Sequence, residues 1–174
     1  ILEARMTYQP NLQDIECILW DVLKADAAVE ALPVFEQIDA DLMRQVLDEA
    51  GKFVSEVVAP LQRASDTVGC RHADGKVTMP PGFRAAHETF WRNGWGGLSV
   101  DPADGGQGLP EVLNQILFEQ LSAACHGWTM APGLMHGAYE CIKHHASDDL
   151  KTRYLDKVGS GEWLATMCLT EPHA

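Results

Sequence analysis

The stretch SDDLKTRYLDKVGSGEWLATMCLTEPHA, residues 147–174, joins a helix with clear end signals to a segment with a different pattern. Ser147 is a suitable N-cap residue, and the two aspartates that follow it place negative charge in the positive first turn. Gly159 can adopt the left-handed conformation that ends a helix. The predicted buried face of this helix consists of Leu150, Tyr154, Leu155 and Val158. The run from Trp163 to Leu169 lacks helical spacing and predicts the start of a strand.

Helical periodicity dominates the rest of the chain. Asp39 can cap a long helix, and Pro60 removes a backbone donor near its end, so a kink or an early stop is expected there. Helices are predicted at Asn11–Lys24, from Asp39 to about Leu61, from Pro80 through Trp91, from Pro110 to about Cys125 and from about Leu134 to His145. The connecting segments are predicted at Asp26–Phe35, Thr67–Pro81 and Asn93–Gly108.

The sequence therefore predicts an all-α fold that enters a strand near its carboxyl end. We expect three parts: an N-terminal extension with one helix at residues 1–37, a helical domain at 38–160, and the start of a β-domain at 161–174. A strand cannot satisfy its backbone hydrogen-bonding groups alone. For this reason we expect the sequence to be the front portion of a longer protein, in which the β-domain is truncated.

Composition narrows the classes of partner. The 174 residues carry 13 basic and 25 acidic side chains, a formal charge of −12. Nucleic acids and anionic membrane surfaces are bound through clustered Lys and Arg, so neither is expected. The stretch from Leu121 to Tyr139 lacks charged residues but contains two histidines and a proline, which favours burial in protein over a membrane span. The five cysteines form no Cys-x-x-Cys pair, which favours reduced thiols and a cytoplasmic location.

Three parts of the sequence resemble the acyl-CoA dehydrogenase family. LTEP at 169–172 resembles the Leu/Val-Thr-Glu-Pro segment that leads from the family's helical N-terminal domain into its β-domain, although His173 stands where a small residue is commoner. DGGQG at 104–108 resembles the family's Tyr-Gly-Gly-x-Gly loop, with Asp104 in the place of Tyr. Residues 6–23 resemble the additional N-terminal helix of the larger 3-methylmercaptopropionyl-CoA dehydrogenase-like subgroup.

The resemblance implies an FAD-dependent α,β-desaturation of an acyl-CoA thioester, with hydride transfer to N5 of the flavin. It also implies an electron-transfer flavoprotein or a similar electron acceptor as a partner, and a homo-oligomer for the full-length protein. The family's catalytic base is a carboxylate of the C-terminal helical domain. No residue of this sequence can be assigned to that role.

By the same resemblance, Met167, Leu169 and Thr170 border the flavin ring, with backbone groups of Leu169 and Thr170 and the Thr170 hydroxyl as hydrogen-bond partners. The chemistry suits this role, because flavin reduction places negative charge on the ring and fixed N–H and O–H donors stabilise it. The alternative is that Thr170 and Glu171 only form a turn at the end of a strand.

The segment around Met130–Tyr139 is placed by the resemblance on the acyl-tail side of the substrate cavity. Gly133 and Gly137 could let an acyl chain approach the backbone closely, or could instead permit close helix–helix packing. His126 and His136 could face the cavity, although an isolated histidine in an apolar stretch is more often a core or rim residue.

Other motifs carry weaker alternatives. Cys141, His144 and His145 have side chains that zinc accepts, but no second cluster at ligand spacing accompanies them, so no metal site is expected. A different function class, a non-enzymatic helical protein-interaction module, would need no cofactor and would bind a protein partner. The predicted strand and the Thr-Glu-Pro segment favour the dehydrogenase over this module.

Overall fold

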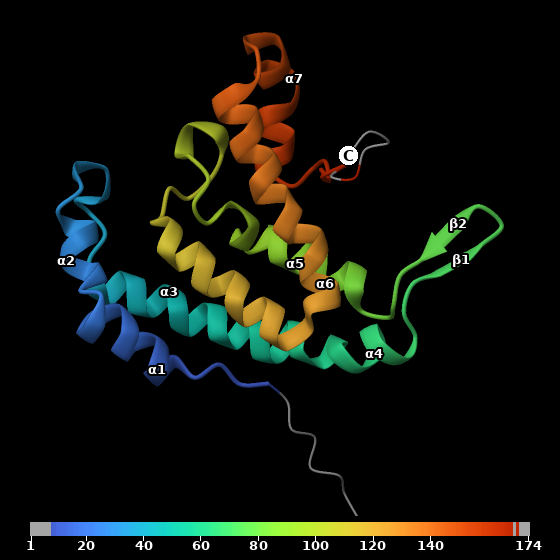
Figure 1. The fold of residues 1–174 in the computed structure, drawn as a ribbon, viewed down its shortest axis with the longest axis horizontal. Helices are drawn as coiled ribbons and strands as arrows, with labels where there is room; N and C mark the ends of the chain where they lie inside the picture. The colour runs from blue at the N-terminus through green and yellow to red at the C-terminus, as the bar shows by residue number, and fades with distance from the viewer. Residues whose placement is uncertain (1–7, 169, 171–174) are drawn as a thin grey trace, which may run out of the picture.

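The computed structural model describes residues 8–168 and residue 170, and these form a mostly helical fold (Figure 1). The first half contains α1 (Leu12–Glu16), π-helical η1 (Cys17–Val22), α2 (Ala25–Glu30), 3-10 helix η2 (Pro33–Phe35), α3 (Ala40–Phe53), π-helical η3 (Val54–Val58), 3-10 helix η4 (Ala59–Leu61) and α4 (Gln62–Thr67). The second half contains β1 (Arg71–Ala73), β2 (Lys76–Thr78), α5 (Phe83–Arg92), 3-10 helices η5 (Trp95–Gly97) and η6 (Pro102–Asp104), α6 (Glu111–His145) and α7 (Asp148–Gly159).

The main hydrophobic core is centred on Phe90 of α5, whose side chain is 0% exposed. Its ring lies between 5.6 and 6.4 Å, centroid to centroid, from four other aromatic rings. These are Phe53, Trp91, Phe118 and Trp128. Leu19 and Trp20 of η1 belong to the same core, so the helix near the N-terminus packs against the elements that follow it.

The long helix forms where the sequence places it. The Asp39 carboxylate accepts a hydrogen bond from the backbone N–H of Leu42 at 2.8 Å, which confirms the predicted N-cap. The α-helix ends at Phe53, and the chain continues through a π-helical turn and a 3-10 turn that contains Pro60. Because proline lacks the N–H that the α-helical pattern needs, the expected interruption at Pro60 is confirmed.

α6 is two helices joined at a bend. Cys125 has φ −158° and ψ 83°, far from helical values, and separates residues 111–124, here called the first leg, from 126–145, the second leg. Figure 1 shows the two legs diverging from this bend. The legs face each other, since His136 Nε2 lies 3.4 Å from Glu111 Oε1. Two helices are therefore present as predicted, but the second begins well before Leu134.

Two predicted connectors contain regular structure. Asp26–Phe35 holds α2 and η2, and Thr67–Pro81 holds an antiparallel hairpin in which His72 pairs with Val77. The hairpin turn places Asp74 and Gly75 at φ 51° and 73°, the left-handed values that a tight hairpin requires. All residues of both strands are exposed, so this segment is a surface connector as predicted, but it contains a hairpin that is not among the predicted elements.

The last helix differs in detail from its prediction. Ser147 occupies the N-cap position of α7, but its side chain makes no capping hydrogen bond. Gly159 is helical, and Gly161 takes the left-handed conformation with φ 74°. Val158 is buried, whereas Leu150 is 42% exposed. Within the described residues, 163–168 form no strand, because a strand needs a neighbouring edge to accept its hydrogen bonds and none lies beside this segment.

His87 of α5 makes the stability of this core depend on pH. It packs edge-on against Trp91, with ring centroids 6.1 Å apart, and burial lowers its pKa below the ordinary 6.5 despite the nearby Glu88. The unfolded chain then binds more protons below pH 6.5, so stability falls as the pH drops through that value. We expect His87→Gln to reduce the loss of melting temperature between pH 7.5 and 5.5. The control His72→Gln, on the exposed hairpin, should retain the wild-type loss, and an unchanged loss in His87→Gln would contradict the assignment.

Candidate functional site

The second leg presents an exposed strip of small and flexible residues. Met130, Gly133 and Gly137 follow one another at helical spacing, and all three are exposed. A Cβ atom added to Gly133 would meet only Phe118 of the first leg, at 3.8 Å. One added to Gly137 would meet no described atom within 4 Å. Gly137 therefore leaves the helix backbone open to an approaching group, whereas Gly133 lies in van der Waals range of the first leg.

The segment after α7 runs beside the second leg. The backbone N–H of Ala165 points at the sulfur of Met135, 2.9 Å away, and Ala165 packs against the small core that contains Met135 and Tyr139. Met167 is 61% exposed and Thr170 is also exposed. Leu169 lies outside the described residues, so the structure places only two of the three predicted flavin contacts.

The segment after α7 presents backbone hydrogen-bond donors. Between Leu164 and Cys168, Ala165 is the one described residue whose backbone N–H has a partner within the described structure. The other residues from 164 to 168, and Thr170, are exposed, so their hydrogen-bonding groups can meet a group that docks on this segment. Hydrogen-bond donors are what a ring that gains negative charge requires.

A cluster of charged and polar groups ties the second leg to the loop at 93–108. Lys143 Nζ donates to Asp101 Oδ2 at 2.7 Å and also to Asp104 Oδ2. The Tyr139 hydroxyl donates to the same Asp104 oxygen at 2.7 Å and accepts from the backbone N–H of Asp101 at 3.2 Å. We call Asp101, Asp104, Tyr139 and Lys143 the clasp.

Electrostatics within the clasp favour its charged form. Burial works to lower the pKa of Lys143, but the hydrogen bonds to Asp101 and Asp104 outweigh it and raise that pKa. The hydrogen bond from Lys143 lowers the pKa of Asp101. Burial, followed by the hydrogen bond to Asp104, raises the pKa of Tyr139. Lys143 is therefore charged and Tyr139 protonated at neutral pH, so the clasp is fully formed there.

Sequence reasoning noted Asp104 only as a departure from the family pattern and did not find the other members of the clasp. A signal did exist, because Tyr139 and Lys143 are four residues apart and so share one helix face. Their partners lie 35 to 42 residues away, which no local pattern shows.

The two histidines of the apolar stretch have different surroundings. His136 lies against Glu111, as described above, and the Glu111 carboxylate also accepts hydrogen bonds from Asn114 and Gln115 at 3.0 and 2.6 Å. Burial opposes ionisation of Glu111, but these and other polar neighbours lower its pKa. His126 is exposed at the bend. His136 therefore serves here as a contact between the two legs.

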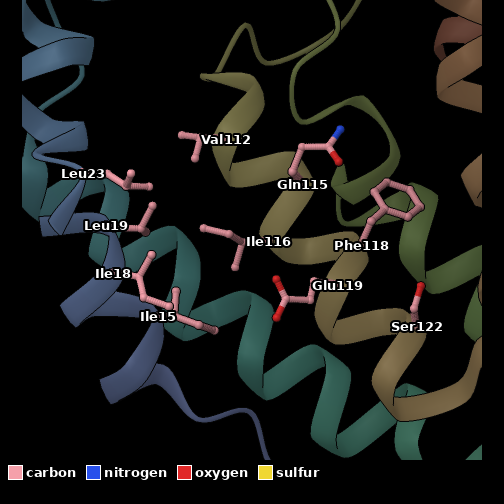
Figure 2. A pocket seen from close by; sticks show the side chains of 10 residues that line it. All are labelled: Ile15, Ile18, Leu19, Leu23, Val112, Gln115, Ile116, Phe118, Glu119 and Ser122. Carbon is pink, nitrogen blue, oxygen red and sulfur yellow. The ribbon is translucent and has the colours of Figure 1, made fainter.

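The other candidate features do not assemble a site. Among the described residues no group of His, Cys, Asp and Glu has the arrangement of a metal site, and His144 pairs with Glu140 instead. None of the described helices combines the length and apolarity that crossing a membrane requires. A groove of about 520 Å³ separates α1 and η1 from the first leg, with Ile18 and Leu23 facing Ile116 across it (Figure 2). No residue predicted to contact flavin or substrate lines this groove.

Comparison with known proteins identifies the family. The family described as "Acyl-CoA dehydrogenase, N-terminal domain" matches residues 41–162. The 3-methylmercaptopropionyl-CoA dehydrogenase of Ruegeria pomeroyi is 38% identical over 169 residues, which are 97% of this chain and 29% of that protein. A butyryl-CoA dehydrogenase of Syntrophomonas wolfei is 30% identical over 98% of this chain and 28% of its own length.

A broad-specificity linear acyl-CoA dehydrogenase of Mycobacterium tuberculosis is 27% identical over 96% of this chain. The chain thus spans less than a third of the length of these curated relatives. The matched region covers α3, the loop at 93–108, both legs of α6 and α7, which together form most of the helical fold. This chain belongs to the acyl-CoA dehydrogenase family and carries that family's N-terminal domain.

Proposed function

We propose that this chain is the front part of an FAD-dependent acyl-CoA dehydrogenase that desaturates an acyl-CoA thioester between its α and β carbons. One observation carries the proposal: the segment predicted to contact flavin lies beside the second leg, the helix that carries the exposed glycines predicted to line the acyl chain. The family membership of the chain supports the same reaction class. Bound FAD would supply the chemistry by accepting a hydride from the β carbon.

In this proposal the residues of this chain bind and orient the flavin and the acyl chain. The Thr170 hydroxyl and the backbone N–H groups of Leu169 and Thr170 would hold the flavin ring, and Met167 would lie against its edge. Met130, Gly133 and Gly137 would form one wall for the acyl chain, and this apolar wall would exclude water from the reacting carbons. Removal of the α proton is assigned to a carboxylate of the C-terminal helical domain, as in the family.

The partners are part of the same proposal. The substrate would be an acyl-CoA, and electrons would pass to an electron-transfer flavoprotein or a similar acceptor. The resemblance to the family supports a homo-oligomer, and the pattern of free cysteines supports a cytoplasmic location. The domain boundaries at 37/38 and 160/161 also remain predictions, the second of them close to the end of the family match at residue 162.

The first test is the visible absorption spectrum of the protein purified from its complete gene. Flavin bands that shift and bleach when an acyl-CoA is added without oxygen would support the proposal. A colourless, folded protein that binds no added FAD would contradict it and would favour the helical interaction module instead.

A substitution at Gly137 tests the acyl wall. We expect Gly137→Leu to reduce kcat/KM for a long-chain acyl-CoA at least about tenfold, because the new side chain would occupy the space the acyl chain needs. Leucine is also the better helix former, so folding should not suffer. The matched control is Ala131→Leu, an exposed position on another face of the second leg. Equal kcat/KM values for both variants and the wild type would place the acyl chain elsewhere.

A further inference from the structure

The orientation of the second leg is not fixed by helix continuity. The hydrogen-bonded ladder of α6 is interrupted at Cys125, and Pro132 removes a further backbone donor inside the second leg. Side-chain contacts must therefore set the angle between the legs: Trp128 in the main core and the His136–Glu111 pair hold the part nearer the bend, and further contacts hold the far end. The contacts at the far end are made to the loop at 93–108 and to α7.

The clasp is the polar part of these contacts and joins three elements. Tyr139 is 2% exposed and shares a small core with Val100 of the loop and Val158 of α7. The Lys143 side chain is only 26% exposed and lies between two carboxylates that would repel each other without it. Charge-assisted hydrogen bonds of this kind are the stronger ones in proteins, so the arrangement is rigid.

The distance from the clasp to the acyl wall is short along the helix. Tyr139 is two residues from Gly137 and Lys143 is six, which is about 3 and 9 Å of helix at 1.5 Å per residue. A helix of this length moves as a unit, so a displacement at Lys143 also displaces the glycines. Shifts of about 1 Å in a positioned group are enough to change catalysis many-fold.

We propose that Lys143, held by Asp101, Asp104 and Tyr139, is a positioning residue that sets the position of the acyl wall and with it the chain length the protein accepts. This inference rests on the proposed function. It goes beyond that function because it assigns substrate selectivity to a half-buried ion cluster that touches no substrate.

The test uses the full-length protein with its flavin and the variant Lys143→Met, which keeps the length of the side chain and removes its charge. Two quantities are measured: the ratio of kcat/KM for a long and a short straight-chain acyl-CoA, and hydrogen exchange at the amides of residues 126–145. We expect the ratio to change about fivefold or more, chiefly through KM, and exchange to accelerate about fivefold. Lys143→Arg, which keeps the charge, should lie close to the wild type.

The matched control is Lys157→Met, which removes the exposed ion pair to Glu162 (2.7 Å) on α7. It should leave both quantities within about twofold of the wild type. If Lys143→Met does not fold, Tyr139→Phe serves instead, because it deletes only the hydroxyl that bridges Asp104 and Asp101. It should change both quantities in the same direction by a smaller factor.

The outcomes separate this inference from the function on which it rests. An active wild type whose chain-length ratio is unchanged in Lys143→Met overturns the inference, even if exchange accelerates, because the clasp would then be structural only. A wild type that oxidises no acyl-CoA overturns the proposed function and the selectivity role together. A changed ratio with accelerated exchange, absent in Lys157→Met, supports the inference.

Discussion

Replacing Phe90 by alanine is expected to destabilise the helical fold by about 3–5 kcal/mol, the range found for large aromatic-to-alanine changes in protein cores. Phe90 is fully buried and its ring contacts aromatic rings from α3, α5 and both legs of α6. Truncation would leave a cavity where these elements meet, and none of them can move inward without losing its other contacts.

The measurement is hydrogen exchange at the buried amides of α3, which open only when this core opens. A loss of 3 kcal/mol or more corresponds to exchange that is faster by at least about 100-fold. Phe90→Leu keeps most of the volume and should accelerate exchange far less. Val34→Ala, at a side chain that is 79% exposed, should have no effect. Similar exchange in Phe90→Ala and Val34→Ala would show that the core is not centred on Phe90.

Elements with local signals were predictable from the sequence. Asp39 begins α3 because its carboxylate can reach the backbone N–H of Leu42, and Pro60 interrupts the helix because it lacks an N–H. Neither effect needs knowledge of distant residues. The hairpin at Arg71–Thr78 had a comparable signal in Asp74-Gly75, a pair that favours the tight turn, but its strands lack an apolar face and resemble a loop.

Elements that depend on distant partners were not predictable in the same way. The segment from Trp163 has the composition of a strand, yet strand formation is decided by the edge available to it, and the described part of the chain supplies none. The clasp is a second example, because Asp101 and Lys143 meet only after the loop and the second leg have folded. The bend at Cys125 is a third, since no glycine or proline marks that residue.

The candidate site combines both kinds of information. The sequence singled out Gly133 and Gly137 but left open whether they serve substrate approach or helix packing. Both are exposed, and among the described residues Gly137 has free space beside it, which favours approach there, whereas Gly133 faces Phe118 of the first leg. Their role, like that of Met167, Leu169 and Thr170, remains a prediction that the Gly137→Leu and flavin experiments test.

Replacing Gly106 by alanine is expected to be the most damaging change in the loop that supports the clasp. A Cβ atom at this position would overlap the backbone carbonyl oxygen of Val100, so the backbone itself must move. The surrounding hydrogen bonds leave little freedom for that movement. They run from Gly106 N to Asp101 O (3.0 Å), from Gln107 N to Gly97 O (2.9 Å), from Gly108 N to Val100 O (2.9 Å) and from Leu109 N to Leu98 O (2.9 Å).

Loss of two or three of these bonds, at about 1 kcal/mol each, together with overpacking beside the buried Val100, gives an expected destabilisation of about 3 kcal/mol or more. The adjacent Gly105 provides the matched control. It has φ 86° but no atom within 4 Å of an added Cβ, so Gly105→Ala should cost only about 1 kcal/mol from the left-handed backbone.

Hydrogen exchange at the amides of Gly108 and Leu109 reports on this loop directly. We expect it to be about 100-fold faster in Gly106→Ala and about fivefold faster in Gly105→Ala. Because the same loop carries Asp101 and Asp104, Gly106→Ala should also accelerate exchange in the second leg of α6, whereas Gly105→Ala should do so only weakly. Equal effects of the two variants would mean that the loop adapts to a Cβ at Gly106, and that its close contact with Val100 does not hold the clasp in place.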